Sequence, residues 1–201
     1  MHSRKFEIDQ HFLKSPRLAL MLIGHSNVRK NDTVLEIGAG TGVITFGLAK
    51  RCKRVIALEP DSETAEKLLN NLKKYRLDNV ELKREKFETF ELPDEAYKIF
   101  ANPPFRISSE IFYKILNLEN MNGEIIEKDV PKNLPKSIYL IVQKNFALKL
   151  IPTERHYTNQ LGKILQKYYN IKIRYPLKKV DFTPPPAVDT VLLECRLKQD
   201  D

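Results

Sequence analysis

Short apolar runs alternate with helix-like segments along the first half of the chain. The runs are rich in Val, Ile and Leu, as buried strands are. The expected strands are residues 33–37, 54–58, 80–82 and 97–101. Between them, capping residues and apolar positions at helical spacing indicate helices. The expected helices are residues 16–27, which open with Pro16, residues 43–50, a segment capped by Asp61, and residues 108–116, capped by Ser108.

The second half continues this alternation after a polar interruption. Residues 118–135 contain Gly and two Pro and favour a surface loop or hairpin. The elements expected after it are a strongly apolar strand at 137–142, helices at 146–151 and 159–169, and two closing strands around Val180 and at 191–197. Buried strands that alternate with helices predict an α/β fold with a mostly parallel sheet. Such sheets bind ligands at the carboxyl ends of their strands.

The composition is that of a soluble globular protein, with 42% hydrophobic and 30% charged residues among 201. This length is sufficient for one large domain with a full core. No apolar run approaches the roughly 20 residues that span a bilayer. The first residues are polar and lack the apolar core of a signal peptide. We therefore expect a cytoplasmic protein.

Basic residues outnumber acidic ones, 34 to 26, and give a net charge of +8. Two interpretations are compatible with this charge. The surface is cationic without an anionic partner, or it binds a polyanion, of which nucleic acid is the commonest. The charge alone does not distinguish between them.

Cysteine and histidine give no sign of a metal centre. Cys52 and Cys195 lie far apart in the sequence and are expected to be reduced and structural. The four histidines, which form no cluster with metal-ligand spacing, are His2, His11, His25 and His156. A metalloenzyme is not expected.

A glycine-rich segment, VLEIGAGTGVITFGLAK, joins the first of these strands to a helix. Gly38, Gly40 and Gly42 allow a tight turn and let a ligand lie against the backbone. A dinucleotide site has the spacing G-x-G-x-x-G, whereas this loop has G-x-G-x-G. Glu36 lies just before the loop, where its carboxylate would repel a pyrophosphate. A cationic ligand without phosphates, such as the sulfonium S-adenosylmethionine, fits the loop better.

Polar groups follow three further strands at the same edge of the expected sheet. Glu59 ends the second strand, where an acid can accept both hydroxyls of a ribose; the alternative is a solvated loop carboxylate. Glu85 follows the third strand and could meet an adenine amine; the alternative is surface pairing with the neighbouring basic residues. The segment NPPF, residues 102–105, follows the fourth strand. Four strand ends that each offer a ligand group favour a binding site.

Together these segments resemble the ribosomal RNA adenine dimethyltransferases, which include small-subunit dimethyladenosine transferases and erythromycin-resistance methyltransferases. QHFL at residues 10–13 resembles the N-terminal Q-N-F-L motif, EIGAGTG the cofactor loop and ALEPD the ribose-binding segment. NPPF resembles the catalytic motif N-[LI]-P-[YF], and LIVQKNFALKL and FTPPPAVDTVLLECRL resemble the late motifs. The resemblance covers roughly residues 6–197. It implies a Rossmann-like, S-adenosylmethionine-dependent methyltransferase fold with a mostly parallel seven-stranded sheet flanked by helices.

The resemblance also implies the cofactor, S-adenosylmethionine, and its contacts. By position and by the loop chemistry above, these are His11, Leu13, Glu36, Gly38, Gly40, Gly42, Glu59, Glu85 and Asn102. Three positions depart from the family pattern. His11 replaces an Asn, Glu85 replaces an Asp, and Pro103 replaces a Leu or Ile.

The implied reaction is methyl transfer to the exocyclic amine of an adenine in ribosomal RNA. The two prolines of NPPF cannot continue a sheet ladder and hold the segment rigid. The Asn102 side-chain oxygen and the Pro103 carbonyl can accept amine hydrogens in the transition state. Phe105 offers a stacking face for the base, and Phe182 resembles the family's second aromatic. For both rings the alternative is core packing. The base must be single-stranded or flipped out to reach them.

The family carries a helical C-terminal domain that contributes to RNA binding, whereas this chain stops at Asp201. We therefore expect a single catalytic domain over residues 1–201, with residues 1–30 bordering the cofactor and residues 118–135 as a surface insertion. We expect a monomer, with a partner protein or the ribosomal particle in place of the missing domain. Basic residues of the last third could contact phosphates or form a solvated face. They are Lys144, Lys149, Arg155, Lys163, Lys167, Arg174, Lys178 and Lys179.

Two other functions share some of these features. A methyltransferase of DNA adenine or protein glutamine would share NPPF but lack the late motif FTPPPAVD. A non-catalytic RNA-binding relative would keep the basic face, but Glu36, Glu59 and Asn102 would be free to change. The motifs do not distinguish which RNA or nucleotide is modified, one methyl from two, or a housekeeping role from antibiotic resistance.

Overall fold

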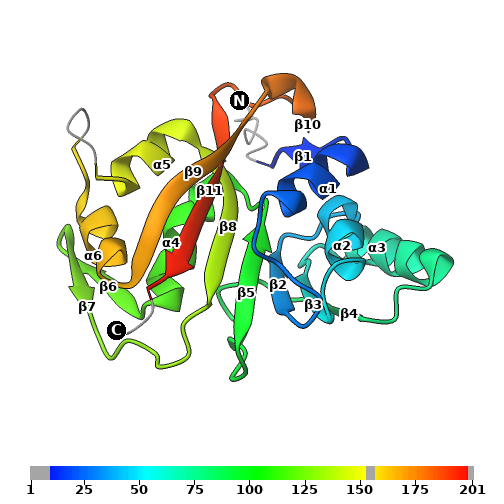
Figure 1. Ribbon diagram of the computed structural model, residues 1–201, viewed down its shortest axis with the longest axis horizontal. Helices are drawn as coiled ribbons and strands as arrows, with labels where there is room; N and C mark the ends of the chain where they lie inside the picture. Colours follow the sequence, from blue (N-terminus) through cyan, green and yellow to red (C-terminus); the bar gives the residue numbers. More distant parts are fainter. Residues whose placement is uncertain (1–9, 153–156, 199–201) are drawn as a thin grey trace, which may run out of the picture.

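A seven-stranded sheet forms the centre of the protein (Figure 1). The computed structural model describes residues 10–152 and 157–198. In spatial order the strands are β4 (Val80–Lys83), β3 (Arg54–Leu58), β2 (Thr33–Ile37), β5 (Tyr97–Ala101), β8 (Ser137–Gln143), β11 (Thr190–Leu197) and β9 (Tyr169–Leu177). The first five are parallel, whereas β11 is antiparallel to both of its neighbours. The mostly parallel, seven-stranded α/β fold is thus confirmed.

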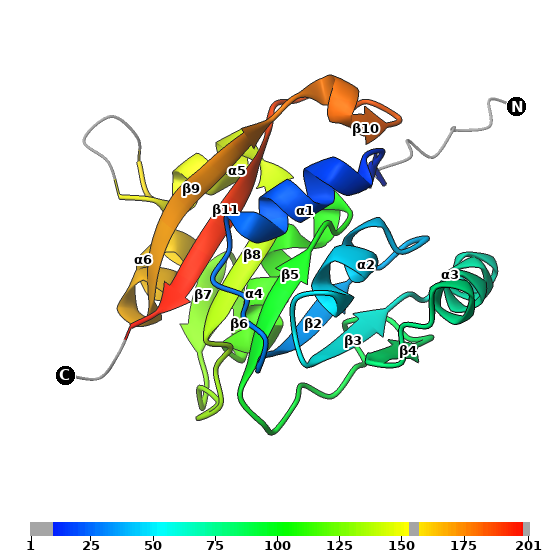
Figure 2. The same ribbon diagram turned by 45° about the vertical axis from the view of Figure 1, so that its right-hand side comes forward.

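Helices cover both faces of the sheet (Figures 1 and 2). They are α1 (Pro16–Gly24), α2 (Val43–Ala49), α3 (Ser62–Tyr75), α4 (Ser108–Ile115), α5 (Lys144–Leu150) and α6 (Gln160–Tyr168). The first three contribute to one buried apolar cluster and the last three to another. Side chains of a strand alternate between faces, so Val34 joins one cluster and Leu35 the other. The parallel strands are buried on both faces, which explains their near-continuous apolar runs.

Two small pairings lie outside the central sheet. β1 (Phe12–Leu13) pairs with β10 (Phe182–Thr183), and so joins the N-terminal segment to a late loop. β6 (Leu118–Met121) and β7 (Glu124–Glu127) form the hairpin that the polar insertion predicted. Short 3-10 helices, η1 (Phe105–Ile107) and η2 (Lys179–Asp181), precede α4 and β10.

Three local predictions were wrong. Ser108 does not cap α4: because η1 runs directly into the helix, the N-cap is Ile107, and no side chain caps it. The segment around Val180 is a 3-10 turn, and the seventh strand is β9, which follows α6 without a loop. The first helix ends at Gly24 and does not extend to residue 27.

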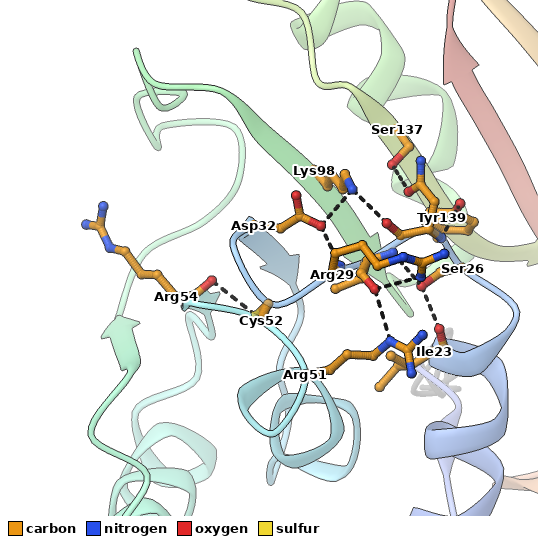
Figure 3. Close-up of polar contacts among 12 residues, drawn as sticks. Ile23, Ser26, Arg29, Asp32, Arg51, Cys52, Arg54, Lys98, Ser137 and Tyr139 are labelled. Carbon is orange, nitrogen blue, oxygen red and sulfur yellow. Dashed lines mark hydrogen bonds and ion pairs between the residues drawn. The ribbon is translucent and has the colours of Figure 1, made fainter.

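A polar network holds the loop between α1 and β2 against the amino-terminal ends of the strands (Figure 3). Lys98 of β5 donates to the Asp32 carboxylate at 2.6 Å and to the Asn27 carbonyl at 2.7 Å. Ser137, the first residue of β8, donates to the Asn27 side chain at 2.7 Å. The Lys98–Asp32 pair is largely shielded from water, so the bond is stronger than a surface ion pair. The network therefore has a structural role: it fixes the α1–β2 loop against the first residues of β5 and β8.

Two further observations bear on the class of protein. Cys52 and Cys195 are both buried and free, as expected for reduced structural cysteines. Within residues 10–152 and 157–198, no helix is both long enough and apolar enough to cross a membrane.

Candidate active site

The glycine loop after β2 adopts a backbone that side chains disfavour. Gly38, Gly40 and Gly42 have φ angles of 75°, 57° and 103°. Gly42 is the N-cap of α2, and a Cβ there would lie 2.7 Å from the Leu68 side chain. The loop therefore needs glycine for conformation at all three positions and for space at the third.

A hollow at the carboxyl edge of the sheet borders this loop; it holds about 400 Å³ of empty space, part of which is open solvent. We call it the loop cavity. Its lining includes residues 10–13 of the N-terminal segment, Glu36, residues 38–41 and Asn102. Segments that are far apart in the sequence thus meet at the ends of β2 and β5.

Glu36 is the acidic group of the loop cavity. Its side chain is 1% exposed, and burial raises the pKa of its carboxyl to about 8. The nearby Glu59 carboxylate acts in the same direction. One Glu36 oxygen, Oε2, has no hydrogen-bond partner among the described residues. A buried carboxylate with an unpaired oxygen beside a cavity suits a cationic ligand group, because such a group would relieve the cost of burial.

A second hollow, with about 780 Å³ of empty space that includes open solvent, lies beside Gly38, and Gln10 and Gly38 line both. We call it the acidic cavity, since its lining includes Glu59, Asp61 and Glu85. The buried Glu59 carboxylate accepts the Gly40 N–H at 2.8 Å through Oε2 and the Asp61 N–H at 3.1 Å through Oε1. Each oxygen retains a lone pair, so the carboxylate can also accept two hydroxyls of a diol.

The surroundings of Glu85 bear on its alternative interpretation. Among the described residues, Lys83 pairs with Glu81 and Arg84 pairs with Glu66. Neither neighbour pairs with Glu85, which instead lines the acidic cavity. Glu85 thus borders the acidic cavity without an ion pair to Lys83 or Arg84, and its contact with a ligand stays a prediction.

The NPPF segment lies between the two cavities. Asn102 Nδ2 donates to the His11 carbonyl at 2.7 Å, which leaves Oδ1 of the amide available as an acceptor. Pro103 is buried, whereas Phe105 is partly exposed. The Phe105 ring contacts the His11 ring with centroids 5.3 Å apart. The His11 ring in turn donates from Nδ1 to the Pro184 carbonyl at 2.8 Å. The N-terminal segment thus connects the strand-end motif to the late loop.

Comparison with known proteins identifies the family of this chain. A family model described as ribosomal RNA adenine dimethylase matches residues 1–201. The chain belongs to the ribosomal RNA adenine dimethylase family. The resemblance carried by the motifs is therefore confirmed. This family uses S-adenosylmethionine as its methyl donor.

Relatives from distant organisms match nearly the whole chain. Ribosomal RNA small subunit methyltransferase A of Thermotoga neapolitana is 32% identical over 197 residues, which are 96% of this chain and 68% of the relative. An rRNA adenine N-6-methyltransferase of Bacteroides fragilis is 33% identical over 94% of this chain and 65% of its own length. A dimethyladenosine transferase from Plasmodium falciparum has a TM-score of 0.79 at 25% identity, over 94% of this chain and 64% of that one. The chain spans about two thirds of the length of these ribosomal RNA adenine dimethylases.

The residues around the two cavities fit S-adenosylmethionine. The loop cavity offers a buried carboxyl group with one unpaired oxygen, which suits the cationic amino acid end. The acidic cavity offers a carboxylate with free lone pairs, which suits a ribose diol. Gly38 borders both cavities and carries no side chain that would separate them. A cofactor with a cation at one end and a nucleoside at the other matches this order.

Most of the residues predicted from the motifs come together at this edge of the sheet. His11, Leu13, Glu36, Gly38, Gly40 and Asn102 line the loop cavity, and Glu59 and Glu85 line the acidic cavity with Gly38. Gly42 lines neither cavity and instead shapes the turn into α2. Pro103 and Phe105 lie beside them in the NPPF segment.

Phe182 differs from the other predicted residues. Its side chain is fully buried in the apolar cluster that includes Leu13, with which it pairs across β1 and β10. This placement favours the packing alternative and gives the ring no exposed face for a base.

Some lining residues were not predicted. Gln10 borders both cavities, although the QHFL motif contained it, and Asp61 was predicted only as a helix cap. Asp61 does cap α3, by accepting the Thr64 N–H at 2.8 Å, and it also lines the acidic cavity. Phe87 lines this cavity too, and no motif marked it.

Two of the predicted basic residues form ion pairs within the protein. Lys167 pairs with Glu127 and Arg174 pairs with Glu194, so these two have structural partners. Arg155 lies outside the described residues. Lys178 and Lys179 are exposed where β9 leads into η2.

Proposed function

We propose that the protein transfers methyl groups from S-adenosylmethionine to the exocyclic amine of an adenine in ribosomal RNA. The observation that carries the proposal is the position of NPPF between the two cavities, in a chain of the ribosomal RNA adenine dimethylase family. Hydrogen-bond acceptors for the target amine, a site for a cation and a site for a ribose are then adjacent. This order is what methyl transfer from a sulfonium nucleoside to an amine needs.

The cofactor would be held by the residues that border the cavities. Glu36 would face the ammonium group, Glu59 the ribose hydroxyls and Glu85 the adenine amine. When bound, the sulfonium supplies an activated methyl group whose leaving group is a neutral thioether. The chain therefore needs no strong acid or base and acts chiefly by positioning.

The target amine is a weak nucleophile because its lone pair is delocalised into the adenine ring. Asn102 Oδ1, left free by the bond from Nδ2 to His11, would accept one amine hydrogen, and the Pro103 carbonyl would accept the other. Both contacts favour the pyramidal nitrogen of the transition state. Phe105, partly exposed beside His11, would stack on the base.

The substrate assignment rests on the relatives. The Thermotoga relative is named as a small subunit methyltransferase, and the Bacteroides relative as an rRNA adenine methyltransferase. We infer that a single-stranded or flipped-out adenine of ribosomal RNA is the target, since a base within a helix is out of reach. We further propose that the protein works in the cytoplasm as a monomer, and that a partner protein or the ribosomal particle supplies additional RNA contacts.

The test uses S-adenosylmethionine labelled in its methyl group. The protein is incubated with separated small and large ribosomal RNAs, with ribosomal particles, and with DNA of matched sequence. We expect label in adenine of one ribosomal RNA, and nuclease digestion then separates monomethyladenosine from dimethyladenosine. Label in DNA or in protein glutamine would contradict the proposal that ribosomal RNA is the substrate. Cofactor binding without transfer to any of these substrates would contradict an enzymatic role.

A further inference from the structure

A third groove lies between the start of α1 and the end of β9, outside the site described above. It has about 840 Å³ of space that opens to solvent. Its lining includes Arg17, Leu18, Met21, Tyr175, Pro176 and Lys178. The groove therefore combines two cations with an aromatic ring and an apolar floor.

The groove opens at the edge of the sheet that carries the active site. In the ladder of β11, Leu177 lies opposite Thr190, which lies opposite Gln143, so β9 and β8 end at the same level. Ser15, another lining residue, is two positions beyond Leu13, which lines the loop cavity. Figure 2 shows the β9–β10 connection passing above the start of α1. A strand that leaves the active site over β1 would enter this groove.

The charge of the groove is positive. Arg17 and Lys178 are exposed, and two further exposed lysines lie close to them in the sequence: Lys14, three positions before Arg17, and Lys179, directly after Lys178. Asp181 also lines the groove, but its carboxylate accepts the Lys178 backbone N–H at 2.7 Å and so belongs to the η2 turn. Two cations line the groove with one carboxylate, and two further lysines lie close by in the sequence, so the local excess of positive charge attracts a polyanion.

The floor of the groove suits a base. The Tyr175 ring stacks on the His25 ring, with centroids 5.2 Å apart and planes at 29°, and this contact holds it in place. Met21 is 36% exposed next to it and leaves apolar surface uncovered. Aromatic and apolar surface between cations is typical of single-stranded nucleic acid sites.

We propose that this groove binds the RNA strand next to the target adenine, with Arg17 and Lys178 on phosphates and Tyr175 against a base. The proposal rests on the proposed function, because it takes RNA as the substrate. The combination of positive charge, an anchored ring and proximity to the active-site edge favours RNA over a protein partner. The groove would thus supply contacts to the substrate strand from within the catalytic domain itself.

The first experiment compares two double variants with the same loss of charge. R17Q/K178Q removes the cations of the groove, and K73Q/K74Q removes two exposed cations from the last turn of α3. Binding to a single-stranded RNA that contains the target is measured as a function of salt. We expect R17Q/K178Q to weaken binding about tenfold at 0.1 M salt and to reduce the salt slope by about 1.4, or 0.7 per lost contact. The control should change the slope by much less.

A second variant tests the base contact. Y175L keeps apolar volume but removes the ring, so it should weaken RNA binding by about fivefold or more with no change in the salt slope. The KM for RNA should rise in both variants more than kcat falls, while calorimetry shows wild-type affinity for S-adenosylmethionine and so a folded protein. Equal effects of R17Q/K178Q and K73Q/K74Q on RNA binding would contradict the proposed RNA site. Unchanged RNA affinity of the Y175L variant would contradict it as well. Loss of binding to a protein partner with unchanged RNA binding would also overturn it.

These outcomes are separate from failure of the proposed function. If the wild-type protein methylates no RNA, the proposed function fails in the wild-type assay. If it methylates RNA and the groove variants behave as the control does, only the groove is excluded.

Discussion

At Glu59, one carboxylate serves both the glycine loop and the acidic cavity. It accepts the Gly40 and Asp61 N–H groups and retains a lone pair on each oxygen. We expect Glu59→Ala to weaken binding of S-adenosylmethionine by about 1.5–3 kcal/mol, the scale of a charge-assisted hydrogen bond. Glu63→Ala is a matched control, because Glu63 is exposed on α3 and, within the described part of the chain, forms an ion pair with Lys67 alone. Calorimetry that gives equal affinities for the two folded variants would remove Glu59 from the cofactor site.

Asn102 tests the chemistry independently of cofactor binding. Its side-chain oxygen is proposed to act in the transition state, so Asn102→Ala should lower kcat about 100-fold while the affinity for S-adenosylmethionine stays within a few-fold. Asn71→Ala is the control, since the Asn71 amide also donates to a backbone carbonyl, that of Thr41 in the glycine loop. Near-normal turnover of Asn102→Ala would contradict the proposed role.

Glu36 should make the stability of the folded protein depend on pH. Its pKa is 4.5 in an unfolded chain and about 8 in the folded protein, because burial disfavours the charge. The folded protein therefore holds a proton that the unfolded chain releases between these values, and stability falls as pH rises from 4.5 to 8. Glu36→Gln cannot ionise, so its stability advantage over the wild type should grow across this range, to roughly 3–5 kcal/mol above pH 8.

Chemical denaturation without cofactor at pH 5, 7 and 9 measures this difference. Parallel pH profiles for the wild type and Glu36→Gln would show that Glu36 ionises normally in the folded protein. The same variant should bind S-adenosylmethionine more weakly, since it lacks the charge that the ammonium group would meet.

The pairing of β1 with β10 joins the N-terminal segment, which lines the loop cavity, to the loop before β11. Phe182 lies in this pairing and is fully buried. Phe182→Ala should destabilise the fold by about 3–5 kcal/mol, because it leaves a cavity. Phe182→Leu should cost less than about 1.5–2 kcal/mol and keep methyl transfer within a few-fold of wild type. A stable Phe182→Leu variant that loses transfer tenfold or more would instead assign the ring to the base.

Individual elements differ in how far the sequence predicts them. The parallel strands were predicted nearly to the residue, because burial on both faces makes them apolar throughout. β9 was missed because it follows α6 without a turn and contains Pro176, which resembles a break. β9 lies at the end of the sheet, and an edge strand tolerates a proline because one side has no partner strand. Val180 was taken for a strand residue, but it is 69% exposed and belongs to η2.

The candidate site was predictable where it follows strand ends. Glu36, Glu59 and the NPPF segment lie at the carboxyl edge, which topology brings together. The bond from Asn102 to the His11 carbonyl was not predictable, because it joins residues 91 positions apart through backbone geometry. The burial of Phe182 likewise depends on the pairing of two short strands that no periodicity marks.

Across the whole molecule, the two halves of the chain have different tasks. Residues 10–121 supply β2 to β5 and the groups that line the two cavities. Residues after the hairpin supply β8, β11 and β9, which extend the sheet, and β10, which holds β1. The boundary between them, the turn at Asn122 and Gly123, is exposed and has positive φ at both residues.

The position of this turn means that the chain could be cut there without dividing either cavity. The two fragments would still be able to meet through the β5–β8 ladder and the β6–β7 pairing, both of which join one half to the other. A nick between Asn122 and Gly123 should leave the native assembly intact, and separately expressed halves should restore methyl transfer when mixed. Transfer would then be second-order in protein: diluting both halves tenfold would lower the rate by more than tenfold, unlike that of the intact chain.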